Sequence, residues 1–268
     1  MDQMNVKITL SYDGTDYCGF QLQTGVRTIE EELEKGLLKI TKVPTKLNCA
    51  GRTDSGVHAE AQVINFFTSI KSMNENNWIQ AFNSVLPKDI RINACEFQDN
   101  DFHARRSSIY REYWYNITNS STISALLYRF SAQFYFFKLD ENLLRLYGNE
   151  ICGEHDFTSF CSANDVSLSK SRFIHSIKVE RTGDQIVIKI IANAFLQHMI
   201  RIIVGTMLKL HKENKPPEDM KRILLAKDRQ DAGTTFVPKG LVFKKVYYDE
   251  SVLKKIYSYE RKNYYKTN

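Results

Sequence analysis

Short apolar segments of two kinds alternate along this chain of 268 residues. Some have the composition of strands, and others place apolar residues at the spacing of one helix face. The longest apolar run, at 199–204, is interrupted by Arg201. It falls well short of the roughly 20 apolar residues that a membrane span needs. We therefore expect a mixed α/β fold with a sizeable core and no membrane-spanning segment.

The first 104 residues have the order strand, loop, helix, strand, helix. Residues 7–12 (KITLSY) have the pattern of a strand, and Thr28 is a candidate N-cap for the helix that follows. A second strand is expected at 62–67 and a second helix at 75–86, which Pro87 ends.

The second half repeats this theme. The expected strands are 111–117, 133–137, 175–181 and 185–192, and the expected helices are 141–152, 197–210 and one that opens at Pro216. No linker rich in Gly, Ser or Pro separates the halves. We therefore predict an α/β (α+β) fold with two lobes, 1–104 and 105–250, that share a continuous, largely antiparallel sheet with a central active-site cleft.

A basic, aromatic tail is expected at 251–268. It carries five Lys and Arg residues and four tyrosines (KKIYSYERKNYYKTN). Such a tail could contact RNA phosphates, or it could be a solvated terminal extension.

Charge and cysteine content narrow the class of protein. The net charge is +6 with 12% aromatic residues, which suits an RNA partner, because cations neutralise phosphates and aromatic faces stack on bases. The five cysteines are scattered without a C-x-x-C pair, so we expect neither a disulfide framework nor a zinc site. The first residues, MDQMNVKITL, lack the pattern of a secretory signal, and we expect a cytoplasmic protein.

The loop 50–59, AGRTDSGVHA, is the most informative stretch for chemistry. Two glycines flank Asp54 between apolar segments, and this arrangement can hold a carboxylate out from a strand edge as a nucleophile. Alternatively, Asp54 could cap its own backbone in an Asx-turn. A triad of Asp54, Ser55 and His58 is disfavoured, since triads are normally assembled from residues distant in sequence.

Arg201 lies within the apolar segment 197–208. A guanidinium there must find an anion or bear a desolvation cost of several kcal/mol. Asp54 is a candidate partner. The alternative is an arginine at the rim of the cleft that reaches solvent.

These motifs together resemble the TruA family of bacterial tRNA pseudouridine synthases, which modify the anticodon stem-loop. Agreement runs in the family's order from about Lys7 to Tyr248. It comprises AGRTDSGVHA together with YDGTDYCGFQLQ (12–23), DFHARRS (101–107), REYWY (111–115), GEHDFTSF (153–160), NAFLQHMIRIIVGTML (193–208) and KGLVFKKVYY (239–248).

The resemblance implies a role for several residues. Asp54 would be the nucleophilic aspartate, Arg201 its ionic partner, and Tyr113 the ring that stacks on the target base. Leu241 would pack in the pocket, and Arg52 would help to hold the flipped nucleotide.

The residues His103, Arg105 and Arg106 would face RNA, although a simple solvated patch is the alternative. The resemblance further implies an isomerase, a tRNA pseudouridine(38–40) synthase, that acts at positions 38, 39 and 40 of the anticodon stem-loop as a homodimer.

The chain departs from the family pattern at three positions. Phe20 stands where an indole is common, Ser55 where alanine is usual, and Gln197 where a second histidine is frequent before His198. None of these removes a catalytic group, so they bear on the choice of substrate positions and on efficiency.

The implied reaction breaks the bond from N1 to C1′, turns the uracil and joins its C5 to the same carbon. It consumes no redox equivalent, so we expect no nucleotide or metal cofactor, and metal-ligand spacings are lacking in the sequence. The aspartate could attack C1′ or remove the 2′ proton to give a glycal, and whether Tyr113 is the base stays open. The rival readings are a non-catalytic RNA-binding module and a carboxylate-based N-glycoside hydrolase.

Overall fold

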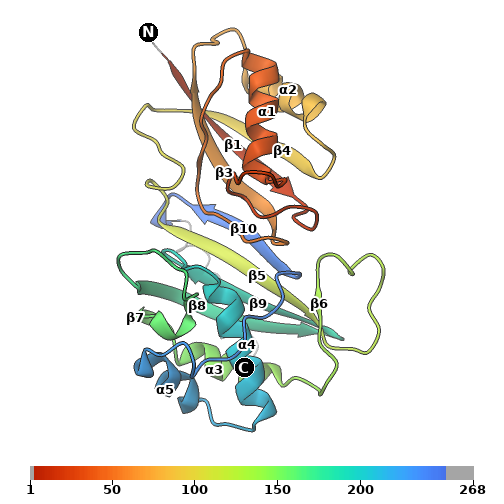
Figure 1. Ribbon diagram of the computed structural model, residues 1–268, viewed down its shortest axis with the longest axis vertical. Helices are drawn as coiled ribbons and strands as arrows, with labels where there is room; N and C mark the ends of the chain where they lie inside the picture. The colour runs from red at the N-terminus through yellow and green to blue at the C-terminus, as the bar shows by residue number, and fades with distance from the viewer. Residues whose placement is uncertain (1–2, 252–268) are drawn as a thin grey trace.

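A ten-stranded sheet forms the centre of the fold. The computed structural model describes residues 3–251. The main strand order is β4-β1-β3-β10-β5-β9-β8-β7, with β2 beside β3 and β6 beside β5 (Figure 1). The strands are β1 (Met4–Tyr12), β2 (Asn48–Cys49), β3 (His58–Thr68), β4 (Ile90–Gln98), β5 (Tyr110–Thr118), β6 (Ala132–Gln133), β7 (Gly153–Asp156), β8 (Ser171–Thr182), β9 (Gln185–Ala192) and β10 (Leu241–Tyr247).

Strand β10 joins the two halves of this sheet. It pairs with β3 in parallel through Val242↔His58 and Phe243↔Ala59, and with β5 antiparallel from Leu241↔Tyr115 onward. A strand from the end of the chain therefore lies between strands of its first and middle parts. The mixed α/β class and the large, mostly antiparallel sheet are confirmed.

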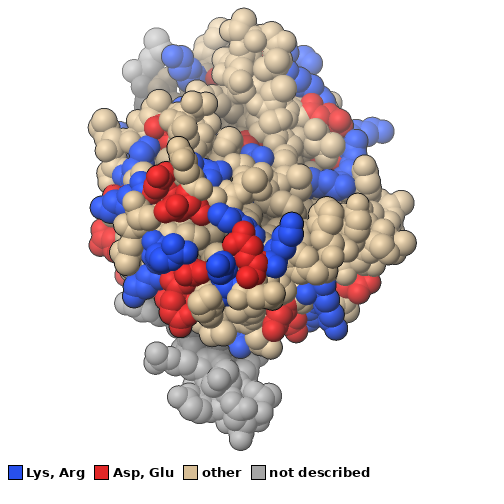
Figure 2. Space-filling view, turned by 60° about the horizontal axis from the view of Figure 1, so that its bottom comes forward, with Lys and Arg blue, Asp and Glu red and all other residues tan. Residues whose placement is uncertain are grey.

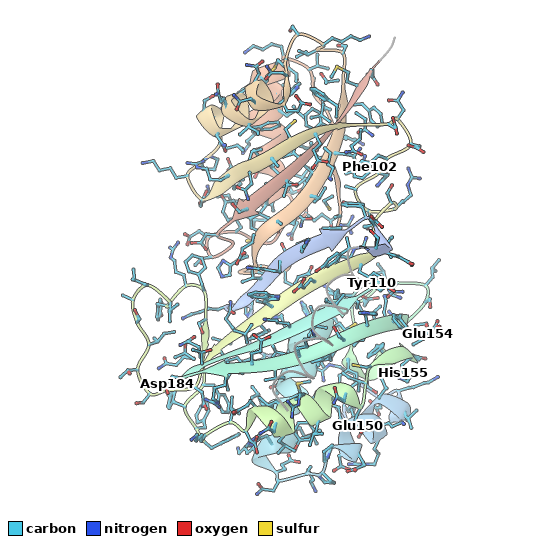
Figure 3. All side chains as sticks on the ribbon, turned by 180° about the vertical axis from the view of Figure 1, so that it is seen from behind. Phe102, Tyr110, Glu150, Glu154, His155 and Asp184 are labelled. Carbon is cyan, nitrogen blue, oxygen red and sulfur yellow. The ribbon has the colours of Figure 1, made fainter. Side chains whose placement is uncertain are left out.

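The helices cover one face of the sheet. They are α1 (Ile29–Thr41), α2 (Glu75–Val85), α3 (Glu141–Asn149), α4 (Met199–Lys212) and α5 (Glu218–Ala226). In Figure 1, α1 and α2 lie in front of the upper strands and α4 in front of the lower ones, whereas from behind the strands β3, β10, β5 and β9 lie nearest the viewer (Figure 3). The strand β5 alternates buried and half-buried residues accordingly, with Arg111, Tyr113 and Tyr115 on the buried side.

The local signals predicted several element ends well. Thr28 caps α1 by accepting a hydrogen bond from Glu31 N, and Asn74 forms a capping box with Asn77 at α2. No helix within residues 3–251 is long and apolar enough to cross a membrane.

Other boundaries differ from the predicted ones. The helix expected from residue 197 begins at Met199, because His198 has a left-handed backbone (φ 61°). The strand expected at 133–137 shrinks to Ala132–Gln133, because the side chain of Asn119 donates to the carbonyls of Phe134 and Phe137 and holds a loop. The strands β2, β4, β7 and β10 were not predicted, and residues 252–268 of the expected tail lie outside the described residues.

In the half of the molecule that contains α3, α4 and α5 (the lower half in Figure 1), packing depends on the close approach of another backbone segment to α4. The segment 231–238 runs along this helix, and Gly233 N donates to Thr206 Oγ1 at 2.8 Å. A Cβ added at Gly205 would lie 1.9 Å from the carbonyl oxygen of Thr234. The backbone of this segment cannot move aside as a flexible side chain could, so glycine is required here.

We expect Gly205→Ala to lower the free energy of unfolding by about 3 kcal/mol or more, because the added methyl forces the helix and the 231–238 segment apart. Urea denaturation checks this. The control is Gly36→Ala in α1, whose Cβ would meet side-chain atoms rather than backbone, the nearest being Leu86 Cδ2 at 3.1 Å and Val85 Cγ2 at 3.5 Å. It should change stability by no more than about 1 kcal/mol, with better helix propensity opposing the crowding. Equal stability of Gly205→Ala and the unaltered protein would contradict the close approach.

Candidate active site

A cleft of about 1360 Å³ lies between the two halves of the sheet. Its lining comes from the segments 18–30, 47–57 and 103–106, the start of β5, the loop 164–167, the segment 194–201 and Leu241. All eight predicted site residues line this one cleft: Asp54, Arg201, Tyr113, Arg52, Leu241, His103, Arg105 and Arg106. They come from segments up to 189 positions apart in the numbering, from Arg52 to Leu241.

The loop that carries Asp54 is fixed by its neighbours. Phe20 N donates to Thr53 O at 3.0 Å, and Tyr12 Oη lies 2.8 Å from Thr53 Oγ1. Gly19 has a φ of +88°, and a Cβ there would lie 2.8 Å from the Thr53 carbonyl oxygen. The motif at 12–23 therefore supports the backbone of the Asp54 loop from below.

The carboxylate of Asp54 faces the guanidinium of Arg201. Arg201 Nη1 donates to Asp54 Oδ2 at 3.0 Å, and Arg201 Nε donates to the carbonyl of Phe236 at 2.8 Å. The Arg201 side chain is 14% exposed and that of Asp54 27% exposed. Arg201 thus does not reach out to solvent, and Asp54 engages a cation across the cleft.

Tyr113 lies in the floor of the cleft between two phenylalanines. Its ring makes edge contacts with Phe195 at 5.1 Å and with Phe243 at 4.8 Å between centroids. Burial raises the pKa of Tyr113 well above its ordinary value, and the negative charge of Asp54 adds to the effect. The phenol is therefore neutral at physiological pH. Leu241, also buried, lines the same cleft from the first position of β10, where it pairs with Tyr115.

The basic residues lie on the rim. Arg52, Arg105 and Arg106 are exposed, and His103 is half-buried. His103 Nδ1 accepts hydrogen bonds from the backbone nitrogens of Arg105 at 3.1 Å and Arg106 at 3.4 Å. Burial and the charges of these two arginines lower the pKa of His103. The neutral imidazole therefore stabilises the turn from which the two arginine side chains extend.

Among the lining residues that were not predicted to belong to the site, His198 and Arg111 are the two whose contacts matter most for it. His198 Nε2 lies 3.6 Å from Asp54 Oδ2, and its positive φ turns the chain at the start of α4. Arg111 is 9% exposed, and every hydrogen bond that it makes within residues 3–251 goes to a carbonyl oxygen. The acceptors are Ala50, Arg105, Ser108 and Asn193. The only sequence signal for Arg111 was its place two residues before Tyr113.

In the structure, Ser55 and His58 of the disfavoured triad with Asp54 have other partners. Ser55 Oγ donates to the carbonyl of Tyr17 at 3.1 Å, while His58 Nδ1 lies 3.1 Å from both Gly14 N and Asp13 Oδ1. Burial lowers the pKa of His58. Its contacts tie β3 to the turn after β1, away from Asp54, so the rejection of a triad holds.

The cleft can thus bind an aromatic or heterocyclic ring against Tyr113 and Leu241 while the Asp54 carboxylate meets an electrophilic carbon. Its exposed arginines suit a polyanion. Cys49 also lines it, but burial raises the pKa of this thiol to about 11, which keeps it protonated and weakly nucleophilic. Among residues 3–251, no group of three or more His, Cys, Asp or Glu side chains could hold a metal ion.

Comparison with known proteins gives a consistent answer. A family model described as tRNA pseudouridine synthase matches residues 8–105 and 149–249. A protein of Colwellia psychrerythraea named tRNA pseudouridine synthase A is 42% identical over 248 residues, which cover 92% of this chain and 95% of the relative. Proteins of the same name from Treponema denticola (42%, covering 94% and 96%) and Bacillus pumilus (39%, covering 92% and 100%) are similar to a like extent.

The raised pKa of Tyr113 predicts an alkaline loss of stability. Below about pH 10 the phenol is protonated in both the folded and unfolded chains, so its contribution is intact there. Above pH 10 the unfolded chain releases the proton while the folded chain retains it. The free energy of unfolding therefore falls by about 1.4 kcal/mol per pH unit for this group, until the folded pKa is reached.

Tyr113→Phe should reduce this fall, because the variant has no phenol to ionise. Urea unfolding at pH 8 and pH 11 measures the difference for both proteins, and the pH 8 values serve as the control for any packing change. The same fall in both proteins would show that the Tyr113 phenol is not held neutral.

Proposed function

Since the chain belongs to the tRNA pseudouridine synthase family, whose members are isomerases, we propose that its cleft converts uridine to pseudouridine with Asp54 as the nucleophile. The observation that carries this proposal is the 3.0 Å ion pair of Asp54 with Arg201 in the cleft. The pair holds the Asp54 carboxylate, whose side chain is only 27% exposed, at a fixed place in the cleft where it can meet a sugar carbon.

The chemistry requires no redox step. The bond between N1 and C1′ breaks, N1 later takes a proton, a new bond forms between C5 and C1′, and C5 loses its proton. Asp54 can attack C1′ to hold the sugar covalently, or it can accept the 2′ proton to give a glycal. Both routes place its carboxylate against the ribose and leave the uracil free to turn within the pocket.

Tyr113 and Leu241 are proposed to form the base-binding floor. A uridine in a stem must leave its stack, which costs a few kcal/mol, and contact with the Tyr113 ring offsets part of that cost. The neutral phenol can also lie near C5 when that carbon loses its proton. Arg52 is proposed to hold the flipped nucleotide, and Arg105 and Arg106, positioned by His103, to contact the RNA backbone.

The RNA contact is assigned to the rim rather than to the end of the molecule formed by the C-terminal lobe. There, Lys and Arg side chains are interspersed with Asp and Glu (Figure 2). On the rim, Arg52, Arg105 and Arg106 gather around one cleft. Same-sign charges that line a cleft attract a polyanion more strongly than a mixed surface does.

We further propose that the substrates are uridines 38, 39 and 40 of the tRNA anticodon stem-loop and that the enzyme works in the cytoplasm. The division into lobes 1–104 and 105–250 is part of this proposal, with the RNA entering between them. A homodimer is proposed because a tRNA is larger than one cleft can grip.

We expect Asp54→Asn to reduce pseudouridine formation by roughly a thousandfold or more, because the amide cannot act as a nucleophile or base. Unmodified tRNA transcripts would be incubated with each protein. Carbodiimide labelling with primer extension would then map pseudouridine, and free uracil would be assayed in parallel. The control is Asp184→Asn, an exposed residue in the β8–β9 turn, at the opposite end of these strands from Glu154 and His155 (Figure 3).

Each outcome has a distinct meaning. Pseudouridine at 38–40 with the unaltered protein and Asp184→Asn, but not with Asp54→Asn, supports the proposal. Free uracil without pseudouridine would indicate an N-glycoside hydrolase. Tight tRNA binding without either product would leave an RNA-binding module.

The dimer is tested separately by sedimentation at micromolar concentrations with and without tRNA. We expect a species of twice the chain mass. A single-chain mass under both conditions would contradict the homodimer and leave the proposed chemistry untouched.

A further inference from the structure

The loop 162–170 carries two apolar side chains that point into solvent at the mouth of the cleft. Val166 is 95% exposed, and Leu168 is wholly exposed. The loop lines the cleft through residues 164–167 and is otherwise made of small and polar residues (SANDVSLSK). The folded protein leaves the apolar surface of both side chains in water. Burial of this surface therefore contributes no free energy to folding and can only stabilise a complex in which a ligand covers it.

Hydrogen bonds to the carboxylate of Asp165 hold the loop in place. The carboxylate accepts hydrogen bonds from Gln197 N at 2.7 Å, Ser167 N at 2.8 Å and Lys170 Nζ at 2.6 Å. Burial opposes ionisation of Asp165, but these hydrogen bonds outweigh it and hold the pKa of this carboxyl below its usual range. Arg172 adds a further tie, because its Nη1 donates to the carbonyl of Ser169 at 3.0 Å.

The same anchor fixes the loop relative to the catalytic carboxylate. Gln197, which donates to Asp165, also accepts a hydrogen bond at its carbonyl from Ser162 N at 3.0 Å. The next residue, His198, lies 3.6 Å from Asp54 Oδ2. The hydrogen bonds to Gln197 therefore fix the position of the loop, and with it Val166 and Leu168, relative to Asp54.

We infer that Val166 and Leu168 are a wedge that inserts into the RNA stem beside the target uridine and fills the gap left when its base turns into the cleft. Apolar side chains used in this way partly unstack neighbouring bases, and the buried apolar area compensates part of the unstacking cost. The inference rests on the proposed function and deepens it, because it names a paired nucleotide in a duplex as the substrate for which the loop is built.

The surroundings favour RNA over a protein partner at this loop. The cleft beside Val166 also exposes Arg52, Arg105 and Arg106, whose charges would contact phosphates on either side of an opened stack. A stacked base offers an apolar face that suits a valine or leucine, while its sugar and phosphate suit the arginines.

The test compares Val166→Ser/Leu168→Ser with the matched surface variant Val43→Ser/Leu225→Ser, whose positions are 58% and 64% exposed and do not line the cleft. Each protein acts on two tRNA transcripts, one with the target uridine paired and one with the opposite nucleotide changed so that it is unpaired. For the wedge variant we expect kcat/KM to fall about tenfold or more on the paired target and less than twofold on the unpaired one. The surface variant should match the unaltered protein on both.

A second readout does not depend on turnover. 2-Aminopurine placed next to the target should brighten when the unaltered protein binds the paired transcript, because the stack opens, and should brighten less with the wedge variant. Equal losses on both transcripts, or undiminished fluorescence with the wedge variant, would overturn the wedge. If the unaltered protein makes no pseudouridine on either transcript, the proposed function itself is contradicted. Thermal unfolding of each variant shows whether a loss of activity comes from misfolding instead.

Discussion

The insertion of β10 between β3 and β5 is the constraint on which the rest of the molecule depends. Its parallel contact with β3 involves two residue pairs, at His58 and Ala59, directly after the Asp54 loop. Its antiparallel contact with β5 begins at Leu241 and passes Tyr113. One short strand thus sets the distance between the loop that carries the carboxylate and the ring that faces it.

The path of the chain into β10 supplies the other half of the ion pair. The segment before this strand runs along α4, where Gly205 lets the backbones meet, and it brings the Phe236 carbonyl to Arg201 Nε. Arg201 is therefore aimed at Asp54 by a helix, a close backbone contact and a strand. The geometry of the cleft and the packing of the lower half have the same origin.

Much of this could be predicted from the sequence, because local patterns carry it. The cap at Thr28, the start of α2 at Glu75 and the glycine-flanked loop at Asp54 depend on neighbours within a few residues. Asp54 was a candidate partner for Arg201 because a guanidinium within an apolar segment needs an anion, and the family resemblance implied this pair.

The parts that the sequence did not indicate depend on long-range pairing. The strand β10 is flanked on both sides by strands distant in sequence, so its short apolar run has no local signal that distinguishes it. The role of Arg111 depends on carbonyls from four separate positions meeting at one point, and no spacing in the chain reveals that. His198 belongs with them, since its place beside Asp54 follows from a left-handed backbone at a residue that is not glycine.

Arg111 has a consequence for the electric field in the cleft. Burial lowers its pKa, yet an arginine keeps its proton at neutral pH. Asp54 and Arg201 cancel one another, whereas the carbonyls around Arg111 carry only partial charges. The floor therefore retains about one positive charge within low-dielectric walls, which concentrate its field toward the opening. An approaching anion is therefore attracted inward, toward Arg111, as well as toward the exposed arginines on the rim.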